Sequence, residues 1–210
     1  MTETIADRRG QLSRDAIIRA AVELIERDGE AAISMRRIAA ELRYGVMSLY
    51  NHVPSKEALL DAVAEHVMDG FDFAPDPDAD WREQTRALVR SFRALARRYP
   101  RCLNVVITRQ LNTTAGLQPL EAALATARSA GFDGETSIRI MRTFVAYALG
   151  GLMNEARLSE YQPTAESGRV DPVRFPNIAE VGWSLTHADH DKDFEFGLEL
   201  LISAVSALPR

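Results

Sequence analysis

Residues 33–56, ISMRRIAAELRYGVMSLYNHVPSK, constrain the fold of this chain more than any other segment. Their apolar spacing predicts two short helices joined by a tight turn, with Ser34 at the position that caps the first helix. The second helix, predicted at about 46–52, is too short to be stable alone. It must therefore be held against other helices, with Leu49 as the side chain that points inward.

Positive charge is concentrated in this segment, although the chain as a whole is acidic. Four cationic side chains and one anionic side chain, Glu41, lie between residues 34 and 56, so the local charge is +3 against a net charge of −5 for the 210 residues. A small basic patch on an acidic protein indicates binding to nucleic acid through oriented contacts. A supported short helix beside such a patch has the geometry that enters the major groove of DNA.

Three runs carry a resemblance to a known family: SRDAIIRAAVELIERDG, ISMRRIAAELRYGVMSLYNHV and PSKEALLDAVAEHV. With them, residues 13–70 resemble the DNA-binding domain of the tetracycline-repressor (TetR) family of bacterial transcription regulators. The most specific part is Leu49-Tyr50-x-His52, followed by Lys56. The resemblance implies a dimeric, ligand-responsive regulator whose partners are a double-stranded DNA operator and a small-molecule effector.

One position departs from the family pattern. Arg43 stands where the family usually has glycine in the turn between the two short helices. Either Arg43 adopts a left-handed backbone or Gly45 absorbs the bend. The sequence leaves both alternatives open.

The resemblance also implies which side chains contact DNA. Positions that match the family's base contacts are Arg36, Val46, Met47, Ser48 and Tyr50. Positions that match its backbone contacts are Ser34, Tyr50, Asn51, His52 and Lys56. Arg37 is a further candidate, and a solvated side chain explains it as well as a phosphate contact does.

Ordinary structural roles compete with some of these assignments. Val46 and Met47 could be packing residues, but Leu49 already fills the inward direction, which favours their exposure. Tyr50 and His52 could be a half-buried aromatic and imidazole, and their place beside the basic patch favours a phosphate role. Ser34 is explained by capping whatever the function.

Apolar residues follow a helical period along nearly the whole chain, which predicts an all-α protein of about ten helices. We expect an N-terminal three-helix, helix-turn-helix domain at 12–70 and a C-terminal helical bundle for ligand binding and dimerisation at 79–210. The Pro- and Asp-rich run FDFAPDPDAD between them predicts the junction. Ser159–Phe175 lacks any period and is expected to be a long loop.

The last predicted helix, about 191–208, is apolar on two faces, which predicts burial all round. Gly150 and Gly151, inside the longest predicted helix, suit a close approach of a second helix. We therefore expect a two-fold symmetric homodimer built by these two helices. A deep core within one chain is the alternative.

Several polar groups fall in helices that ought to be buried, which is typical of an apolar small-molecule pocket with a few convergent polar groups. The candidate ligand-binding residues are Asn104, Thr108, Met141, Phe144, Tyr147 and Trp183. Ordinary core and surface positions are the alternative for each residue. The expected mechanism is a population shift in which ligand and DNA weaken each other's binding.

Other functions are disfavoured. No enzyme motif, metal-ligand cluster or cofactor motif is recognisable, so we expect no catalysis, metal or cofactor. A helical enzyme or carrier remains the second alternative and an architectural DNA-binding protein the third; repression and activation are not distinguished. The lone Cys102, a polar first dozen residues and an apolar run of only residues 143–153 predict a cytoplasmic protein without a membrane contact.

Overall fold

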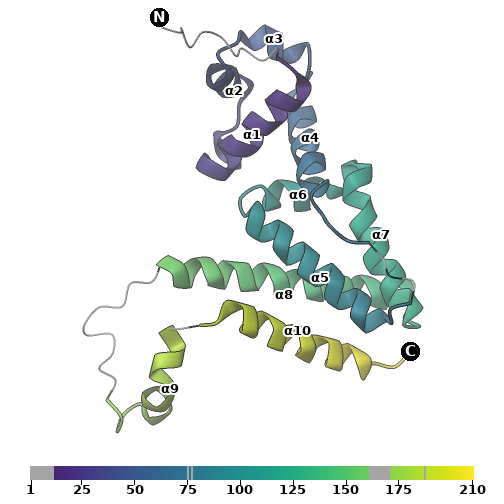
Figure 1. Ribbon diagram of the computed structural model, residues 1–210, viewed down its shortest axis with the longest axis vertical. Helices are drawn as coiled ribbons and strands as arrows, with labels where there is room; N and C mark the ends of the chain where they lie inside the picture. The colour runs from purple at the N-terminus through teal and green to yellow at the C-terminus, as the bar shows by residue number, and fades with distance from the viewer. Residues whose placement is uncertain (1–11, 75, 77, 161–170, 187) are drawn as a thin grey trace, which may run out of the picture. The chain divides into compact units, whose positions relative to one another are not determined.

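A computed structural model describes residues 12–74, 76, 78–160, 171–186 and 188–210, and at positions 110, 157–160 and 183–186 it describes the backbone only. In these ranges the chain forms ten α-helices, two short 3-10 turns and no strand, which confirms the predicted all-α class (Figure 1). The helices are α1 (Arg14–Asp28), α2 (Met35–Leu42), α3 (Val46–Tyr50), α4 (Lys56–Met68), α5 (Trp81–Arg98), α6 (Leu103–Arg109), α7 (Thr114–Ser129), α8 (Gly134–Glu160), α9 (Pro176–Thr186) and α10 (His190–Ser206).

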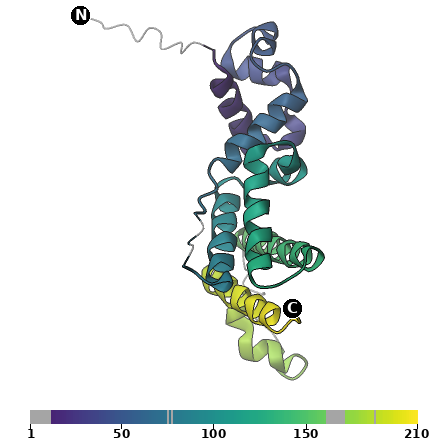
Figure 2. The same cartoon turned by 90° about the vertical axis from the view of Figure 1, so that its right-hand side faces the viewer.

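The chain divides into two compact units, and residues 12–72 and 98–118 form the first. Here α1, α2, α3 and α4 gather into one group, seen from two sides in Figures 1 and 2, and α6 packs along α4. The core is closed by completely buried aliphatic side chains from every helix of the group. They include Ile17, Leu24, Ile25, Ile38, Leu49, Leu59, Val63, Val67 and Val105.

Serine caps fix where three of these helices begin. The Ser13 hydroxyl accepts the backbone N–H of Ala16 at 3.2 Å, and Ser55 accepts that of Ala58 at 3.0 Å. Ser34 accepts the N–H of Arg37 at 3.2 Å, as predicted. Each cap satisfies a donor that the first turn of a helix leaves open and contributes about 1 kcal/mol.

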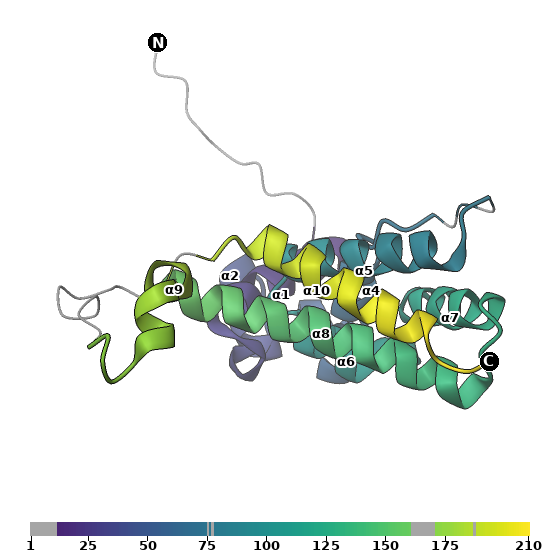
Figure 3. The ribbon, with the colours of Figure 1, turned by 90° about the horizontal axis from the view of Figure 1, so that it is seen from below.

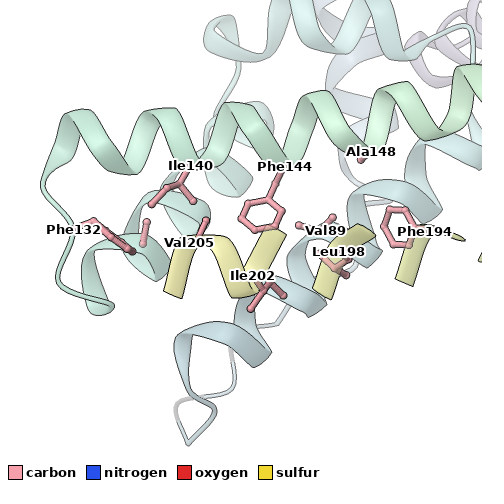
Figure 4. Packing of buried hydrophobic residues seen from close by; sticks show 10 residues of the cluster. Val89, Phe132, Ile140, Phe144, Ala148, Phe194, Leu198, Ile202 and Val205 are labelled. Atoms are coloured by element: carbon pink, nitrogen blue, oxygen red, sulfur yellow. The ribbon is translucent and has the colours of Figure 1, made fainter. Parts of the chain in front are cut away.

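The second unit comprises residues 73–97 and the chain from 119 onward. In it α8 and α10 run side by side in opposite chain directions (Figures 1 and 3). The apolar side chains between them form a continuous core together with Val89 from α5, Ala127 from α7 and Phe132 from the segment before α8 (Figure 4). Its buried members are Val89, Ala127, Phe132, Ile140, Phe144, Ala148, Phe194, Leu198, Ile202 and Val205.

One end of this core is fixed by an ion-pair network that joins α5, α8 and the start of α10. The almost completely buried Arg93 guanidinium binds the Glu155 carboxylate, lies 3.0 Å from Asp191 and stacks on the Phe194 ring at 4.1 Å. Arg97 contacts the same two carboxylates at 3.0 and 2.7 Å. A buried guanidinium is stable only when its donors are paired, so this network holds the three helices in register.

Helix ends differ from the predicted ones by a few residues. The second short helix, predicted at about 46–52, ends at Tyr50, two residues early. Helix α7 begins at Thr114, where the Thr113 hydroxyl accepts the N–H of Gly116 at 3.1 Å. Of the predicted loop, Ser159 and Glu160 belong to α8, and residues 161–170 lie outside the described residues. In the described part, no helix is both long and apolar enough to cross a membrane.

Candidate DNA-binding surface

The turn between α2 and α3 resolves the question that the sequence left open at Arg43. Arg43 has φ 59° and ψ 39°, the left-handed conformation, whereas Gly45 is extended at φ −69° and ψ 142°. The N–H of Tyr44 donates to the Ala39 carbonyl at 3.0 Å, and the N–H of Arg43 donates to Ala40 at 3.2 Å. This pair of bonds is the Schellman ending of a helix, normally made with glycine at the left-handed position.

Helix α3 is only five residues long and is held by its inward face. Leu49 is completely buried, and Val53, just after the helix, is almost completely buried, as the predicted inward anchor requires. On the opposite face Met47 is 75% exposed and Tyr50 is also exposed. Burying Leu49 fixes the rotation of α3, so Met47 and Tyr50 must face solvent.

The predicted DNA-contacting residues occupy one connected stretch of chain around α3. Arg36 is exposed on α2, and Asn51, His52 and Lys56 are exposed between α3 and the first turn of α4. Val46 and Ser48 are half-buried at the base of α3. The Ser34 hydroxyl accepts a bond within its own cap and still has a hydrogen to donate.

The cations around α3 differ in whether an acidic side chain holds them. Arg37 binds the Asp28 carboxylate at the end of α1, a pairing that sequence reasoning missed because the two residues are separated by a turn. Arg36, Arg43 and Lys56 make no ion pair or side-chain hydrogen bond to any other described residue. Three cations are therefore available to an anionic ligand without breaking an existing contact.

The start of helix α6 is hydrogen-bonded to the end of α1. The sequence did not reveal this arrangement. The Glu26 carboxylate accepts the backbone N–H of Cys102 at 2.8 Å and that of Arg101 at 3.2 Å, which caps the start of α6. The Arg101 guanidinium donates in return to the Arg27 carbonyl at the end of α1. Each helix end thus receives the charge that its unsatisfied backbone groups favour.

The other end of α6 is fastened to α4. The Arg109 guanidinium lies 2.9 Å from the Asp61 carboxylate, and the Asn112 amide donates to the same oxygen at 3.3 Å. The hydrogen bond from Arg109 lowers the pKa of Asp61, with a smaller contribution from Asn112, while burial opposes the shift. At neutral pH the pair is therefore charged and intact.

Cys102 lies in the same α1–α6 contact and is completely buried. Burial, and then the neighbouring Glu26, raise the pKa of its thiol far above the ordinary range. A thiol that stays protonated is a poor nucleophile. The structure therefore favours a packing role for Cys102.

The six predicted ligand-binding residues lie in different surroundings. In the first unit, the Asn104 amide donates to Glu30 at 2.8 Å, and the Thr108 hydroxyl bonds carbonyls of its own helix. In the second unit, Phe144 is buried in the α8–α10 core. The Tyr147 hydroxyl donates to the Phe194 carbonyl at 2.7 Å.

The remaining two candidates are less informative. Met141 is half-buried on α8, and the side chain of Trp183 lies outside the described residues. A hollow of about 410 Å³ in the second unit is lined by other residues, among them Asp76, Glu83 and Arg90. The ligand-binding assignment therefore stays a prediction.

Comparison with known families covers almost the whole chain. The family of bacterial regulatory proteins called tetR matches residues 17–63, and the tetracyclin repressor-like C-terminal domain matches residues 74–208. The chain belongs to the TetR family. The resemblance first indicated by residues 13–70 is thereby confirmed, and it extends to the second half of the chain.

Individual proteins similar to this chain agree with this membership. The HTH-type transcriptional repressor DrrR1 of Streptomyces coeruleorubidus is 30% identical over 216 residues, which cover 94% of this chain and 78% of that protein. The Streptomyces coelicolor TetR family protein ActR in complex with (S)-DNPA superimposes with a TM-score of 0.76 at 26% identity, covering 93% of this chain and 98% of ActR. ActR has also been solved in complex with actinorhodin.

Another structurally similar protein has been solved on DNA. BioQ, known from Mycobacterium smegmatis, was crystallised with its natural double-stranded DNA operator. That structure is similar to this chain with a TM-score of 0.64 and 25% identity, covering 94% of this chain and all of that one. The relatives are DNA-binding transcription regulators, and several are named repressors.

Proposed function

We propose that this TetR-family protein represses transcription by binding a two-fold symmetric DNA operator as a homodimer, and that a small-molecule effector releases it. The observation that carries the proposal is the rigidly held α3, with Met47 and Tyr50 turned outward among the unpaired Arg36, Arg43 and Lys56. Work on chromosomal DNA would place the protein in the cytoplasm. The proposed domains are 12–70 for DNA binding and 79–210 for effector binding and dimerisation.

The proposed contacts divide by chemistry. The forked guanidinium of Arg36 suits the two acceptors of a guanine edge, and Met47 suits the methyl group of thymine. Tyr50, His52 and Lys56 offer the hydroxyl, imidazole and ammonium donors that phosphates accept. The other proposed contact residues are Ser34, Arg37, Val46, Ser48 and Asn51.

The outer face of α10 supports the proposed homodimer. Phe196 is 68% exposed and Leu200 is 56% exposed, one helical turn apart, and Met153 on α8 is exposed as well. At Gly150 and Gly151 an added methyl group would meet no other described part of the chain within 4 Å. Adjacent exposed apolar side chains are typical of a surface that a partner covers, and a second copy would place two α3 helices on one duplex.

The fastening of α6 supports a route for the effector signal. Because α6 is bound to α1 through Glu26 and to α4 through Asp61, a displacement of α6 must strain the helices that support α3. An effector that favours a displaced α6 would therefore weaken DNA binding, and DNA would weaken effector binding by the same factor. The complexes of ActR with actinorhodin and of BioQ with its operator are consistent with both halves of this coupling.

The test begins with selection of duplexes from a random library by the purified protein. We expect a palindromic sequence that is bound by a dimer and preferred at least about 1,000-fold over random competitor. Arg36→Ala should lose about 1–3 kcal/mol of binding free energy for this duplex and relax the preference at one base position. Failure to enrich any sequence would contradict the proposal.

Phosphate contact by Lys56 is tested through the salt dependence. Lys56→Ala should weaken binding to all duplexes alike and lower the slope of log affinity against log salt by about 0.9 for each subunit. Arg139→Ala is the control, because Arg139 is exposed on α8 and paired with Glu135. It should leave affinity and slope unchanged.

A further inference from the structure

Arg43 carries a backbone strain that the fold itself does not require. It is the single non-glycine residue with a positive φ among the described residues. For residues other than glycine, asparagine and aspartate, the left-handed conformation brings the Cβ atom too close to the following carbonyl oxygen. Such strained positions cluster where a side chain has a functional task.

The end of α7 shows how the same turn is made without strain. The N–H of Gly131 donates to the Arg128 carbonyl at 2.9 Å, and the N–H of Phe132 donates to Ala127 at 3.3 Å, the same bond pattern as at the end of α2. There the left-handed position, at φ 91°, is glycine. What arginine adds at position 43 is therefore a side chain, since glycine would serve the turn better.

Contacts within the chain do not account for that side chain. Arg43 is exposed, and neither an ion pair nor a hydrogen bond joins its guanidinium to another described residue. Two other arginines of this unit differ from it, because Arg27 binds Glu41 and Arg37 binds Asp28. The Arg43 charge is thus uncompensated within the described part of the chain.

We propose that Arg43 binds a DNA phosphate at the edge of the groove that receives α3, and that this contact depends on its charge. Arg43 precedes α3 by three residues and follows α2 directly, so it flanks the helix and does not belong to its outer face. Groups at the edge of a docked helix meet the sugar-phosphate backbone, whereas groups on its face meet bases. The inference rests on the proposed function and adds an anchoring residue that the family pattern does not supply.

Three substitutions separate the charge from the backbone. Arg43→Lys keeps the charge and the Cβ atom, Arg43→Gln keeps only the Cβ atom, and Arg43→Gly keeps neither. Affinity for the duplex that the wild-type protein selects is measured across a salt series, and the melting temperature is measured without DNA. Arg139→Gln, which removes one exposed positive charge from α8, is the matched control.

We expect affinity to follow the charge. Arg43→Gln and Arg43→Gly should both bind roughly 30-fold more weakly at 0.15 M salt, with a slope lower by about 1.8 for a dimer that loses two phosphate contacts. Arg43→Lys should stay within about threefold of wild type. Arg139→Gln should match wild type.

We expect the melting temperature, in contrast, to depend on whether residue 43 has a Cβ atom. Arg43→Gly should melt at the wild-type temperature or up to about 3 °C higher, because glycine relieves the left-handed strain. Weaker DNA binding by a protein of equal or greater stability excludes misfolding as its cause.

Three results would overturn the assignment while leaving the proposed function intact. They are wild-type affinity in Arg43→Gln, a loss confined to Arg43→Gly, and a loss of preference at one base position without a change in salt slope. The second would show that the shape of the turn matters, and the third that Arg43 reads a base. If the wild-type protein selects no duplex, the proposed function itself fails and this inference fails with it.

Discussion

Helices α3 and α10 differ in how many of their apolar side chains are exposed. In α3, Leu49 is completely buried, and the outward Met47 stands alone among polar and cationic neighbours. In α10, Leu198 is completely buried, but Phe196 and Leu200 are exposed one turn apart. A single exposed methionine is ordinary on a protein surface, whereas adjacent exposed phenylalanine and leucine indicate a contact surface.

The two units therefore differ in how their apolar surface is buried. The first unit closes its core within one chain and presents charge, so it is suited to a polyanion. The α8–α10 pair leaves apolar surface open, so it is suited to a second apolar surface such as its own copy. Four substitutions, each with a control substitution, test this contrast.

The largest effect is expected at the anchor of α3. Leu49→Ala removes a completely buried side chain and should lower the free energy of unfolding by about 2–5 kcal/mol, measured by urea denaturation. Met47→Ala, on the exposed face of the same helix, should change stability by less than about 0.5 kcal/mol. Equal losses in both variants would show that α3 is not held in the described rotation.

The second effect tests the open face of α10. Phe196→Glu should raise the dimer dissociation constant on the order of 100-fold, measured by sedimentation, because a covered interface leaves the added charge unpaired. Leu111→Glu is the control, since Leu111 is 71% exposed in the first unit. A protein that sediments identically with either substitution would contradict the proposed interface.

The third effect concerns the close approach of α10 and α8. Gly197→Ala should cost about 1–3 kcal/mol in thermal or chemical unfolding, because its methyl group would overlap the Tyr147 hydroxyl and ring. Gly150→Ala meets open space within the chain and should gain up to about 1 kcal/mol from helix propensity. A comparable loss in Gly150→Ala would show that the partner copy packs closely against α8 at this glycine.

The smallest effect is a pH dependence at the ion-pair network. Burial raises the pKa of the Glu155 carboxyl, but hydrogen bonds from Arg97 and Arg93 outweigh it, so the pKa lies below its ordinary value. A depressed folded-state pKa contributes stability above about pH 4.3, and that contribution is lost as pH falls through the folded-state value.

Denaturation of wild type and Glu155→Gln from pH 6 to pH 3 measures this contribution. The stability difference between the two proteins should shrink steadily below about pH 4.3. Glu135→Gln, in an exposed pair with Arg139, should show no such change. A difference that stays constant across the range would exclude the network as a source of acid sensitivity.

Local signals made much of the fold predictable. The cap at Ser34, the inward Leu49 and the all-α class follow from spacing and side-chain chemistry, and the structure confirms them. For the turn at Arg43 the sequence left two backbone conformations open, a left-handed Arg43 or a bend at Gly45, because either one can form the turn. Only the bonds of Tyr44 and Arg43 to α2 decide between them.

Long-range pairings were not predictable. The Asp28 partner of Arg37 and the Glu26 cap of α6 depend on how helices cross, and no local pattern encodes the crossing. Gly150 drew attention as a site of close approach because glycine is costly inside a helix, yet within this chain the close approach falls at Gly197. Contacts with DNA or effector stay predictions for the same reason, since each depends on a second molecule.

The seam between α1 and α6 contains the single thiol of the sequence, completely covered at Cys102. A water-soluble alkylating reagent can reach this sulfur only when the two helices separate. The rate of alkylation of the unmodified protein therefore measures how often α1 and α6 separate, as amide exchange measures local opening. A molecule that stabilises or weakens the α1–α6 contact would therefore be detected as slower or faster alkylation of Cys102, before its chemical identity is known.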